Sequence, residues 1–214
     1  MEYIEEHSVK YEQNRIATLK TTYYDADYNK IGEINSDFSP GARFGSYDFT
    51  DERLQYRDGA KVQSDQIMVY SQKATEDRIK TKYLQRNSDQ ILGQGFHPFI
   101  LENFEALLKG EAYTAKLVLP SQMSEFDVRI GKEKVENGRL QVRIEMDNWF
   151  LRLFAPHIEA DYDIETRRLI AYRGVSAISN ASGENVPVTI FYSYPPQRPM
   201  AGANSFRTPP PARQ

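Results

Sequence analysis

The sequence predicts a mainly β protein of the α+β class. The expected fold is a strongly curved antiparallel sheet, or open half-barrel, of about ten strands that wraps one long helix, with one short apolar helix beside it. Three observations predict this fold: alternating apolar and polar residues over much of the chain, one long segment with a helical period, and turn residues between the alternating segments. Because a sheet of this length must curl or close, we expect the helix to lie in its hollow.

The helix is expected within residues 93–110, the only long segment whose apolar residues recur with a helical period. These residues form a stripe along one face, which a helix in a strand-rich chain would bury against the sheet. The stripe consists of Phe96, Phe99, Ile100, Phe104, Leu107 and Leu108.

Both ends of the predicted helix carry recognisable signals. Pro98 suits the first helical position, which makes His97 the cap. Phe96 and Leu101 could form a hydrophobic staple at this start. Lys109 in the last turn and Gly110 directly after it predict the C-terminal end.

The part of the chain before the helix is expected to form strands joined by turns. Residues 3–38 predict two or three long strands, with turn residues at 25–30, and Pro40-Gly41 interrupts the chain. Asp58-Gly59 is a hairpin signal. Further strands are expected at residues 45–56, 66–70 and 79–84.

After the helix, apolar and charged residues alternate regularly. This alternation predicts an antiparallel sheet with one dry face and one wet face. Asn137-Gly138 and residues 165–168 are tight hairpin links. The expected strands cover residues 113–119, 126–130, 140–146, 158–164, 169–175 and 188–194.

Two segments depart from this pattern. Residues 148–156 read Asn-Trp-Phe-Leu-Arg-Leu-Phe-Ala-Pro and predict a short helix with apolar residues on nearly every side. Residues 195–214 are rich in Pro, Ala and Gly, which predicts a mobile tail. We therefore expect a single β-rich domain over residues 1–194, followed by a Pro-rich tail.

Composition limits the classes of function. The chain has 214 residues, of which 40% are hydrophobic, and these proportions are typical of a globular protein with a sizeable core. Its net charge of −3 argues against nucleic-acid binding. Cysteine is absent, which excludes disulfides and thiolate sites. No apolar run has the length of a membrane span, and the acidic start is unlike a signal peptide.

Residues that could carry chemistry are scattered. His7, His97 and His157 lie far apart in the sequence, which favours caps and surface positions over metal ligands. Glu159, Asp161 and Asp163 would share one strand face with carboxylates about 7 Å apart, a pattern that could hold calcium but is more typical of a solvated face opposed by Arg143 and Arg129. We expect neither a metal nor a cofactor.

Two glycine motifs are near misses. Residues 174–178 read Gly-Val-Ser-Ala-Ile and lack the second glycine of a nucleophile elbow. Gly93-Gln-Gly95 has Pro98 where a dinucleotide-binding loop needs its third glycine.

Three motifs together resemble a group of uncharacterised bacterial envelope proteins, over residues 15–194. They are Gly-Gln-Gly-Phe-His-Pro-Phe-Ile at 93–100, Leu-Val-Leu-Pro-Ser at 117–121 and Tyr-Asp-Ile-Glu-Thr-Arg-Arg-Leu-Ile-Ala-Tyr-Arg-Gly-Val-Ser at 162–176. The architecture resembles the open β-barrel of the lipoprotein-localisation-factor type, in which a curved sheet shelters acyl chains around a helix. This resemblance implies a mature periplasmic protein; without it, a cytoplasmic location is the expectation.

The favoured hypothesis is a non-enzymatic envelope protein that binds a lipid or another apolar ligand between helix and sheet. The alternatives are an assembly protein with a self-packed core and a partner in the envelope, and a hydrolase that uses an acidic pair or His97. The residues expected to bind the ligand are Phe96, Phe99, Phe104, Leu107, Trp149, Phe150 and Phe154.

Overall fold

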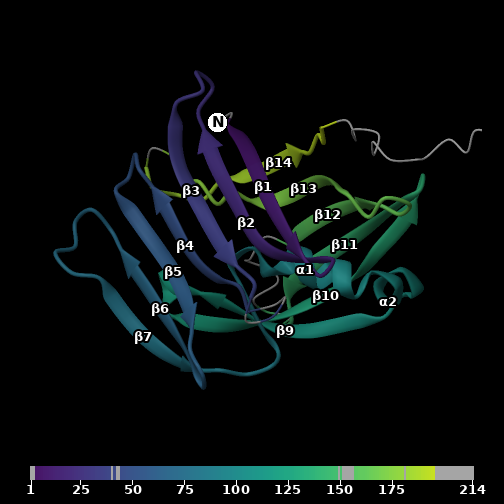
Figure 1. Ribbon diagram of the computed structural model, residues 1–214, viewed down its shortest axis with the longest axis horizontal. Helices are drawn as coiled ribbons and strands as arrows, with labels where there is room; N and C mark the ends of the chain where they lie inside the picture. The colour runs from purple at the N-terminus through teal and green to yellow at the C-terminus, as the bar shows by residue number, and fades with distance from the viewer. Residues whose placement is uncertain are drawn as a thin grey trace, which may run out of the picture.

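The described part of the chain folds into two sheets of seven strands each (Figure 1). The computed structural model describes residues 3–39, 41, 44–148, 150, 157–180 and 182–195. The first sheet contains β1 (Ile4–Glu12), β2 (Arg15–Tyr24), β3 (Lys30–Asp37), β4 (Ser46–Asp51), β5 (Tyr56–Val62), β6 (Gln66–Gln72) and β7 (Lys80–Gln85). The second contains β8 (Gln90–Leu92), β9 (Ala112–Leu119), β10 (Ser124–Glu136), β11 (Arg139–Met146), β12 (Ile158–Asp163), β13 (Leu169–Val175) and β14 (Pro187–Phe191).

In both sheets, strands that follow each other in the sequence are neighbours. Every strand pairing in the described residues is antiparallel except that of β8 with β9, which is parallel. The prediction of one curved sheet or open half-barrel of about ten strands is therefore wrong. Open sheets rarely exceed about ten strands without curling or splitting, and this chain splits its strands into two sheets.

The prediction of one long helix is also wrong. Its segment forms a 3₁₀ turn (Gly93–Gly95) and two short helices, α1 (Phe96–Glu102) and α2 (Phe104–Lys109). The helices are separated by Asn103, whose backbone has left the helical region (φ −106°, ψ 18°). The Asn103 side chain donates a hydrogen bond from Nδ2 to the carbonyl of Phe99 at 2.8 Å, a local bond that competes with helical geometry.

The C-terminal end of the helical segment was predicted correctly, and the N-terminal end was not. Gly110 ends α2 in the left-handed conformation at φ 99°, and Lys109 occupies the last turn, which confirms the C-terminal signal. At the other end, α1 begins at Phe96 after Gly95, so Pro98 is its third residue and His97 is not the cap. Gly93, just before this start, has a positive φ of 50°, which glycine adopts without strain. A Cβ atom at this position would also collide with the Tyr47 ring.

Two hairpin signals had different outcomes. Asn137 and Gly138 both have positive φ, at 51° and 71°, and link β10 to β11 as predicted. Asp58 and Gly59 instead lie inside β5, where Gly59 pairs with Asp48 and Tyr70. Gly59 is needed there because a Cβ atom would collide with the Tyr47 carbonyl and the Tyr70 hydroxyl.

The largest core lies between the two helices and the inner face of the second sheet. The stripe residues Phe99, Phe104 and Leu107 are at most 1% exposed there. Their partners on the sheet include Ile130, Leu140, Val142 and Tyr162. A second core joins the first sheet to the second through Leu92 of β8 and Val118 of β9. The helices thus fill one end of the inner face of the second sheet.

None of the helices among the described residues combines the length and the apolar character that crossing a bilayer requires. Of the predicted short helix at 148–156, residues 149 and 151–156 lie outside the described residues, as does the tail from residue 196.

Candidate functional site: a groove between the two sheets

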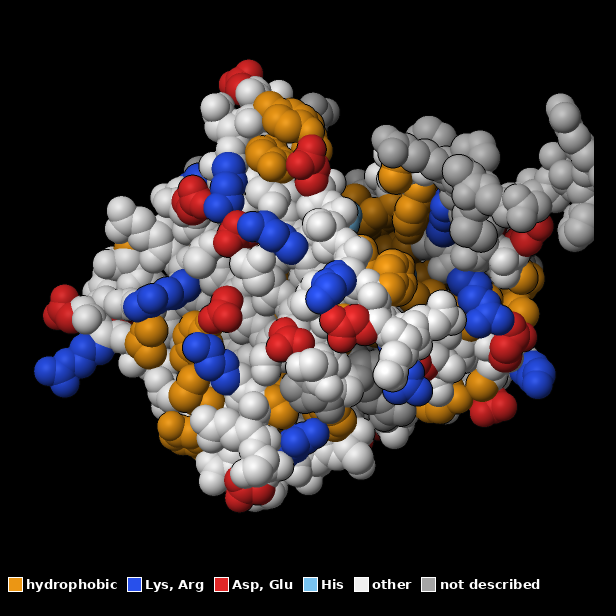
Figure 2. All heavy atoms as spheres, viewed as in Figure 1, with side chains coloured by type: hydrophobic (Ala, Val, Ile, Leu, Met, Phe, Trp, Pro, Cys, Tyr) orange, Lys and Arg blue, Asp and Glu red, His pale blue; other side chains and the backbone are white. Residues whose placement is uncertain are grey.

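A groove of about 3210 Å³ opens between the inner faces of the two sheets, beside α1. Side chains of β1 and β2 line it from the first sheet, and side chains of β12, β13 and β14 line it from the second. Figure 2 shows hydrophobic side chains set back in a hollow over the region of β12 and β13. The groove occupies the part of the inner face that the helices leave uncovered.

The walls of the groove combine aliphatic and aromatic side chains with polar ones. Its lining includes Phe96, Leu101, Ile144, Ile158, Leu169 and Ile190. Apolar side chains on β1 and β14, the two strands that border the groove, are also exposed to solvent. Phe191 on β14 is 77% exposed and Tyr11 on β1 is 60% exposed. Exposed apolar residues that gather around a hollow are typical of an interaction or ligand site.

The sequence-predicted ligand residues do not gather in this groove. Among them, Phe96 lines it. Phe99, Phe104 and Leu107 instead pack in the core between helices and sheet, where they are at most 1% exposed. Phe150 is 55% exposed. Trp149 and Phe154 lie outside the described residues.

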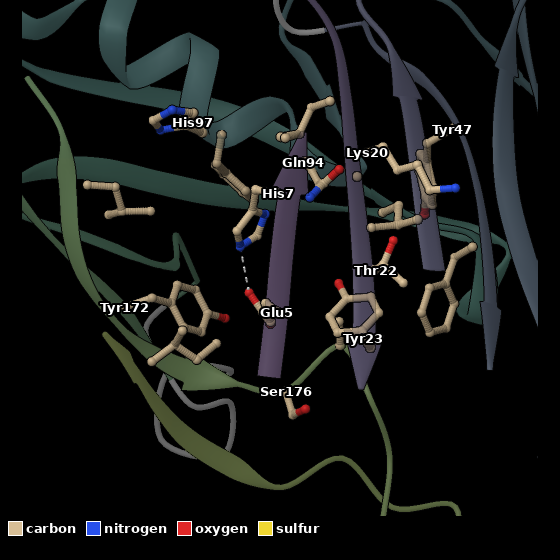
Figure 3. A pocket seen from close by; sticks show the side chains of 18 of the residues that line it. Glu5, His7, Lys20, Thr22, Tyr23, Tyr47, Gln94, His97, Tyr172 and Ser176 are labelled. Carbon is tan, nitrogen blue, oxygen red and sulfur yellow. Dashed lines mark ion pairs between the residues drawn. The ribbon is translucent and has the colours of Figure 1, made fainter. Parts of the chain in front are cut away.

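A chain of polar side chains runs from β1 through β2 and the 3₁₀ turn (Gly93–Gly95) to β3. Glu5 and His7 share one face of β1 because they are two residues apart. His7 Nε2 lies 3.1 Å from Glu5 Oε2 (Figure 3). His7 Nδ1 lies 2.8 Å from Thr21 Oγ1. Thr21 accepts a 2.7 Å hydrogen bond from Gln94 Nε2. Gln94 in turn accepts one from Ser36 at 3.0 Å.

The contacts of this chain agree with two proton arrangements. Thr21 Oγ1 accepts from Gln94, and it either donates its own proton to His7 Nδ1 or accepts a second hydrogen bond from it, while His7 Nε2 faces Glu5. The order of carboxylate, imidazole and hydroxyl is that of a nucleophile triad. Thr21, however, is 0% exposed, so its hydroxyl cannot reach a substrate in the groove.

Tyrosines surround the Glu5 carboxylate. In Figure 3, Tyr172 and Tyr23 lie on either side of Glu5, His7 lies above it and Ser176 below. Burial, followed by the charge of Glu5, raises the pKa of Tyr23 and raises that of Tyr172 to about 12. The same two causes raise the pKa of Tyr192 and Tyr3. These hydroxyls therefore remain protonated at neutral pH.

His97 lies at the border between the groove and the helix-covered core. Its ring stacks on that of Tyr162, with 5.8 Å between centroids, and its Nδ1 is 3.0 Å from the Tyr162 hydroxyl. Burial, with a smaller contribution from His7, lowers the pKa of His97 to about 4. His97 is therefore neutral at pH 7. No carboxylate contacts it among the described residues, so the geometry does not favour a hydrolase built on His97.

The acidic residues of β12 belong to an ion-pair network. Arg143 lies 3.3 Å from Glu159, and Arg173 lies 2.6 Å from Asp161, so Arg173 takes the place that the sequence suggested for Arg129. Within the described residues, no group of three or more His, Asp or Glu side chains could hold a metal ion.

The serine of the near-miss elbow has a structural role. Ser176 is 3% exposed, donates to the Ile178 carbonyl at 2.6 Å and accepts from the Ile178 amide at 3.0 Å. It closes a local turn after β13 and is not presented as a nucleophile.

Asp58, on β5, is a buried acid outside the polar chain and the ion-pair network. Burial raises the pKa of Asp58 to about 6, although the Tyr56 hydroxyl donates to it at 2.8 Å and opposes the shift.

No protein-family model matches this chain, and neither curated proteins nor solved structures yield a match. The function therefore has to be argued from the groove itself.

Sequence reasoning missed the residues that give the groove its polar wall. His7 was interpreted only as an isolated surface or capping residue, and Glu5 was assigned no role. A usable signal was present: Glu5, His7 and Val9 alternate along one strand and must therefore share a face. Their partners Tyr172 and Tyr192 come from the other end of the chain, and no local pattern brings those segments together.

Proposed function

We propose that this protein binds an apolar or acyl-chain ligand in the groove between its two sheets. The observation that carries the proposal is the volume of about 3210 Å³, lined by aliphatic and aromatic side chains from both sheets. Most small-molecule sites occupy less than about 1,000 Å³, so this groove has room for a long chain. The predicted periplasmic location stays a prediction.

The proposal differs from the helix-and-sheet site suggested by the sequence. Phe99, Phe104 and Leu107 fill the space under the helices with their own side chains. Binding there would require unpacking the core, whereas the groove needs no rearrangement. The open groove also distinguishes this proposal from an assembly protein whose interior is filled throughout.

The test is the binding of uncharged, single-chain alcohols to the full-length protein. N-phenyl-1-naphthylamine, a neutral fluorophore that brightens in apolar surroundings, serves as the probe, and octanol, decanol and dodecanol displace it. Each buried methylene contributes about 0.8 kcal/mol, so affinity should rise roughly fourfold per CH₂.

A matched pair of variants locates the binding. Ile190→Asp places a charge on a side chain that lines the groove and should weaken decanol binding by about tenfold. Val135→Asp changes a residue of β10 that is 47% exposed and outside the groove lining, and should leave affinity within about twofold. No fluorescence gain with the unaltered chain, or equal losses in both variants, would refute the proposal.

A further inference from the structure

Glu5, on β1, is a largely buried carboxylate that no lysine or arginine neutralises in the described part of the chain. Its side chain is only 9% exposed. Asp51, at 2%, is paired with Arg53 at 2.7 Å, and Asp161, at 8%, is paired with Arg173 at 2.6 Å. The only ion-pair partner of Glu5 in the described part of the chain is His7, with no lysine or arginine. A buried carboxylate without a permanent counter-charge is costly, so a cation at this point would be stabilised.

Lys20, the lysine labelled in the close-up, already has ion-pair partners. Lys20, on β2, lies in the same view as Glu5 (Figure 3), but its Nζ is 2.9 Å from Glu33, which also pairs with Lys30 at 3.0 Å. These contacts hold Lys20 in a surface ion-pair cluster. Lys20 therefore does not supply a counter-charge to Glu5, and the groove that Glu5 lines is open to a cation from outside.

Aromatic rings surround the position that such a cation would take. Tyr3 and Tyr23 meet edge to face with 6.1 Å between ring centroids, and the His7 ring lies 5.4 Å from that of Tyr192. Tyr172 approaches Glu5 from β13 (Figure 3). Several aromatic rings around one carboxylate form the type of cage that recognises alkylated ammonium groups, because the ring faces attract the cation and need no hydrogen bond from it.

We infer that the ligand of this groove carries a cationic head, an ammonium or quaternary ammonium group, held by Glu5 within the cage of Tyr3, Tyr23, Tyr172 and Tyr192. This inference rests on the proposed function, since the groove would receive the apolar chain while the cage holds the head. Glu5 and the four rings line the same groove as the aliphatic residues. One amphipathic molecule can therefore contact both.

The experiment compares ligands that share a ten-carbon chain and differ in the head. Decyltrimethylammonium, decylammonium, decanol and decanoate displace the neutral fluorophore from the full chain, each below its micellar concentration. Decyltrimethylammonium should bind about tenfold tighter than decanol, and decanoate should bind more weakly than decanol.

Variants then assign the preference to the cage. Glu5→Gln should bring the affinities for decyltrimethylammonium and decanol to within about twofold of each other, while decanol affinity itself is retained. Glu136→Gln removes a carboxylate of β10 that is 61% exposed and lies outside the groove lining, and should keep the cation preference. Should Glu5→Gln fail to fold, Tyr172→Leu, which removes one ring of the cage, should reduce the preference severalfold.

The outcomes separate the two proposals. Binding of decanol without any preference for the cationic heads, or a preference for decanoate, overturns the cationic head and leaves the apolar groove standing. Failure of all four ligands to displace the fluorophore refutes the proposed function itself. A cation preference that survives Glu5→Gln also overturns the assignment to Glu5.

Discussion

The space between the two sheets has a closed end and an open end. At the closed end, α1 and α2 press Phe99, Phe104 and Leu107 onto the second sheet, and these side chains are at most 1% exposed. At the open end, β1 and β2 face β12 to β14 across a groove of about 3210 Å³. The strands that border the open end leave Tyr11 and Phe191 60% and 77% exposed.

The difference teaches that the same sheet face can serve as core or as site. β12 contributes to both ends: Tyr162 packs edge to face on Phe104 in the core, and Tyr162 and Ile158 also line the groove. The two environments meet along α1, where Phe96 and Leu101 line the groove while Phe99 is 0% exposed in the core. The closed end should therefore carry stability and the open end should carry binding.

The largest effect is expected at the closed end. Phe104→Ala removes a ring that is 1% exposed and should lower the free energy of unfolding by about 3–5 kcal/mol, since a cavity remains. Ile190→Ala at the open end is the control and should cost less than about 1.5 kcal/mol, because its side chain is only partly buried. Urea denaturation measures both changes. Similar losses in the two variants would remove the distinction between the ends.

A second prediction concerns the buried acid of the first sheet. Because burial raises the pKa of Asp58 from 3.8 to about 6, the folded state favours the neutral carboxyl. Its contribution to stability is complete below about pH 4 and is lost as the pH rises through 6. Asp58→Asn should therefore be more stable than the unaltered chain at pH 8, by about 2 kcal/mol, and no more stable at pH 3.5.

Thermal unfolding of both proteins across pH 3.5–8 provides the measurement. An advantage of Asp58→Asn that does not change with pH would contradict the assigned burial. Asp161→Asn is a useful contrast, since this carboxylate is held by Arg173 and its replacement should destabilise the protein at pH 8.

At the border between the two ends, His97 should produce the opposite pH dependence. Burial lowers its pKa from 6.5 to about 4, so the folded state favours the neutral ring. This contribution is complete above about pH 6.5 and is lost as the pH falls through 4. His97→Gln should flatten the fall in stability across this window by about 1–2 kcal/mol. The measurement is the free energy of unfolding of both proteins as a function of pH. If the slope of this curve is the same in His97→Gln as in the unaltered chain, His97 is more exposed to water than its burial implies.

The smallest effect is expected on the outer side of the closed end. Arg167 lies 2.7 Å from Glu105 and 5.4 Å from the centre of the Phe104 ring, but both charged side chains are largely exposed. Arg167→Ala should therefore lower the free energy of unfolding by only about 0.5–1 kcal/mol. Denaturation with guanidinium chloride is the measurement. A loss as large as that of Phe104→Ala would show that the cover of the closed end depends on this surface contact.

The sequence predicted the closed end better than the open end, for physical reasons. The apolar stripe is a local pattern with one period, and its members Phe99, Phe104 and Leu107 are buried as expected. The turn at Asn137-Gly138 is likewise determined by two adjacent residues, and it was predicted correctly. The break at Asn103 was missed because a side chain bonded to its own backbone outweighs the apolar period.

The open end depends on contacts that no local pattern contains. Tyr3 reaches Ser176 across 173 positions of the chain, with 3.2 Å between their hydroxyl oxygens. The prediction of a single sheet left no second face against which β1 could form a groove. Trp149 and Phe154 remain predictions, since both lie outside the described residues.

The most direct test of the distinction between the two ends is a photocrosslinking map. A decyl chain with a terminal diazirine and a trimethylammonium head is irradiated with the full-length protein, and the labelled peptides are identified by mass spectrometry. The groove predicts labels on peptides of β1 (Ile4–Glu12) and β14 (Pro187–Phe191), with none on α2 (Phe104–Lys109). Labels concentrated on α2, or spread evenly along the chain, would contradict it.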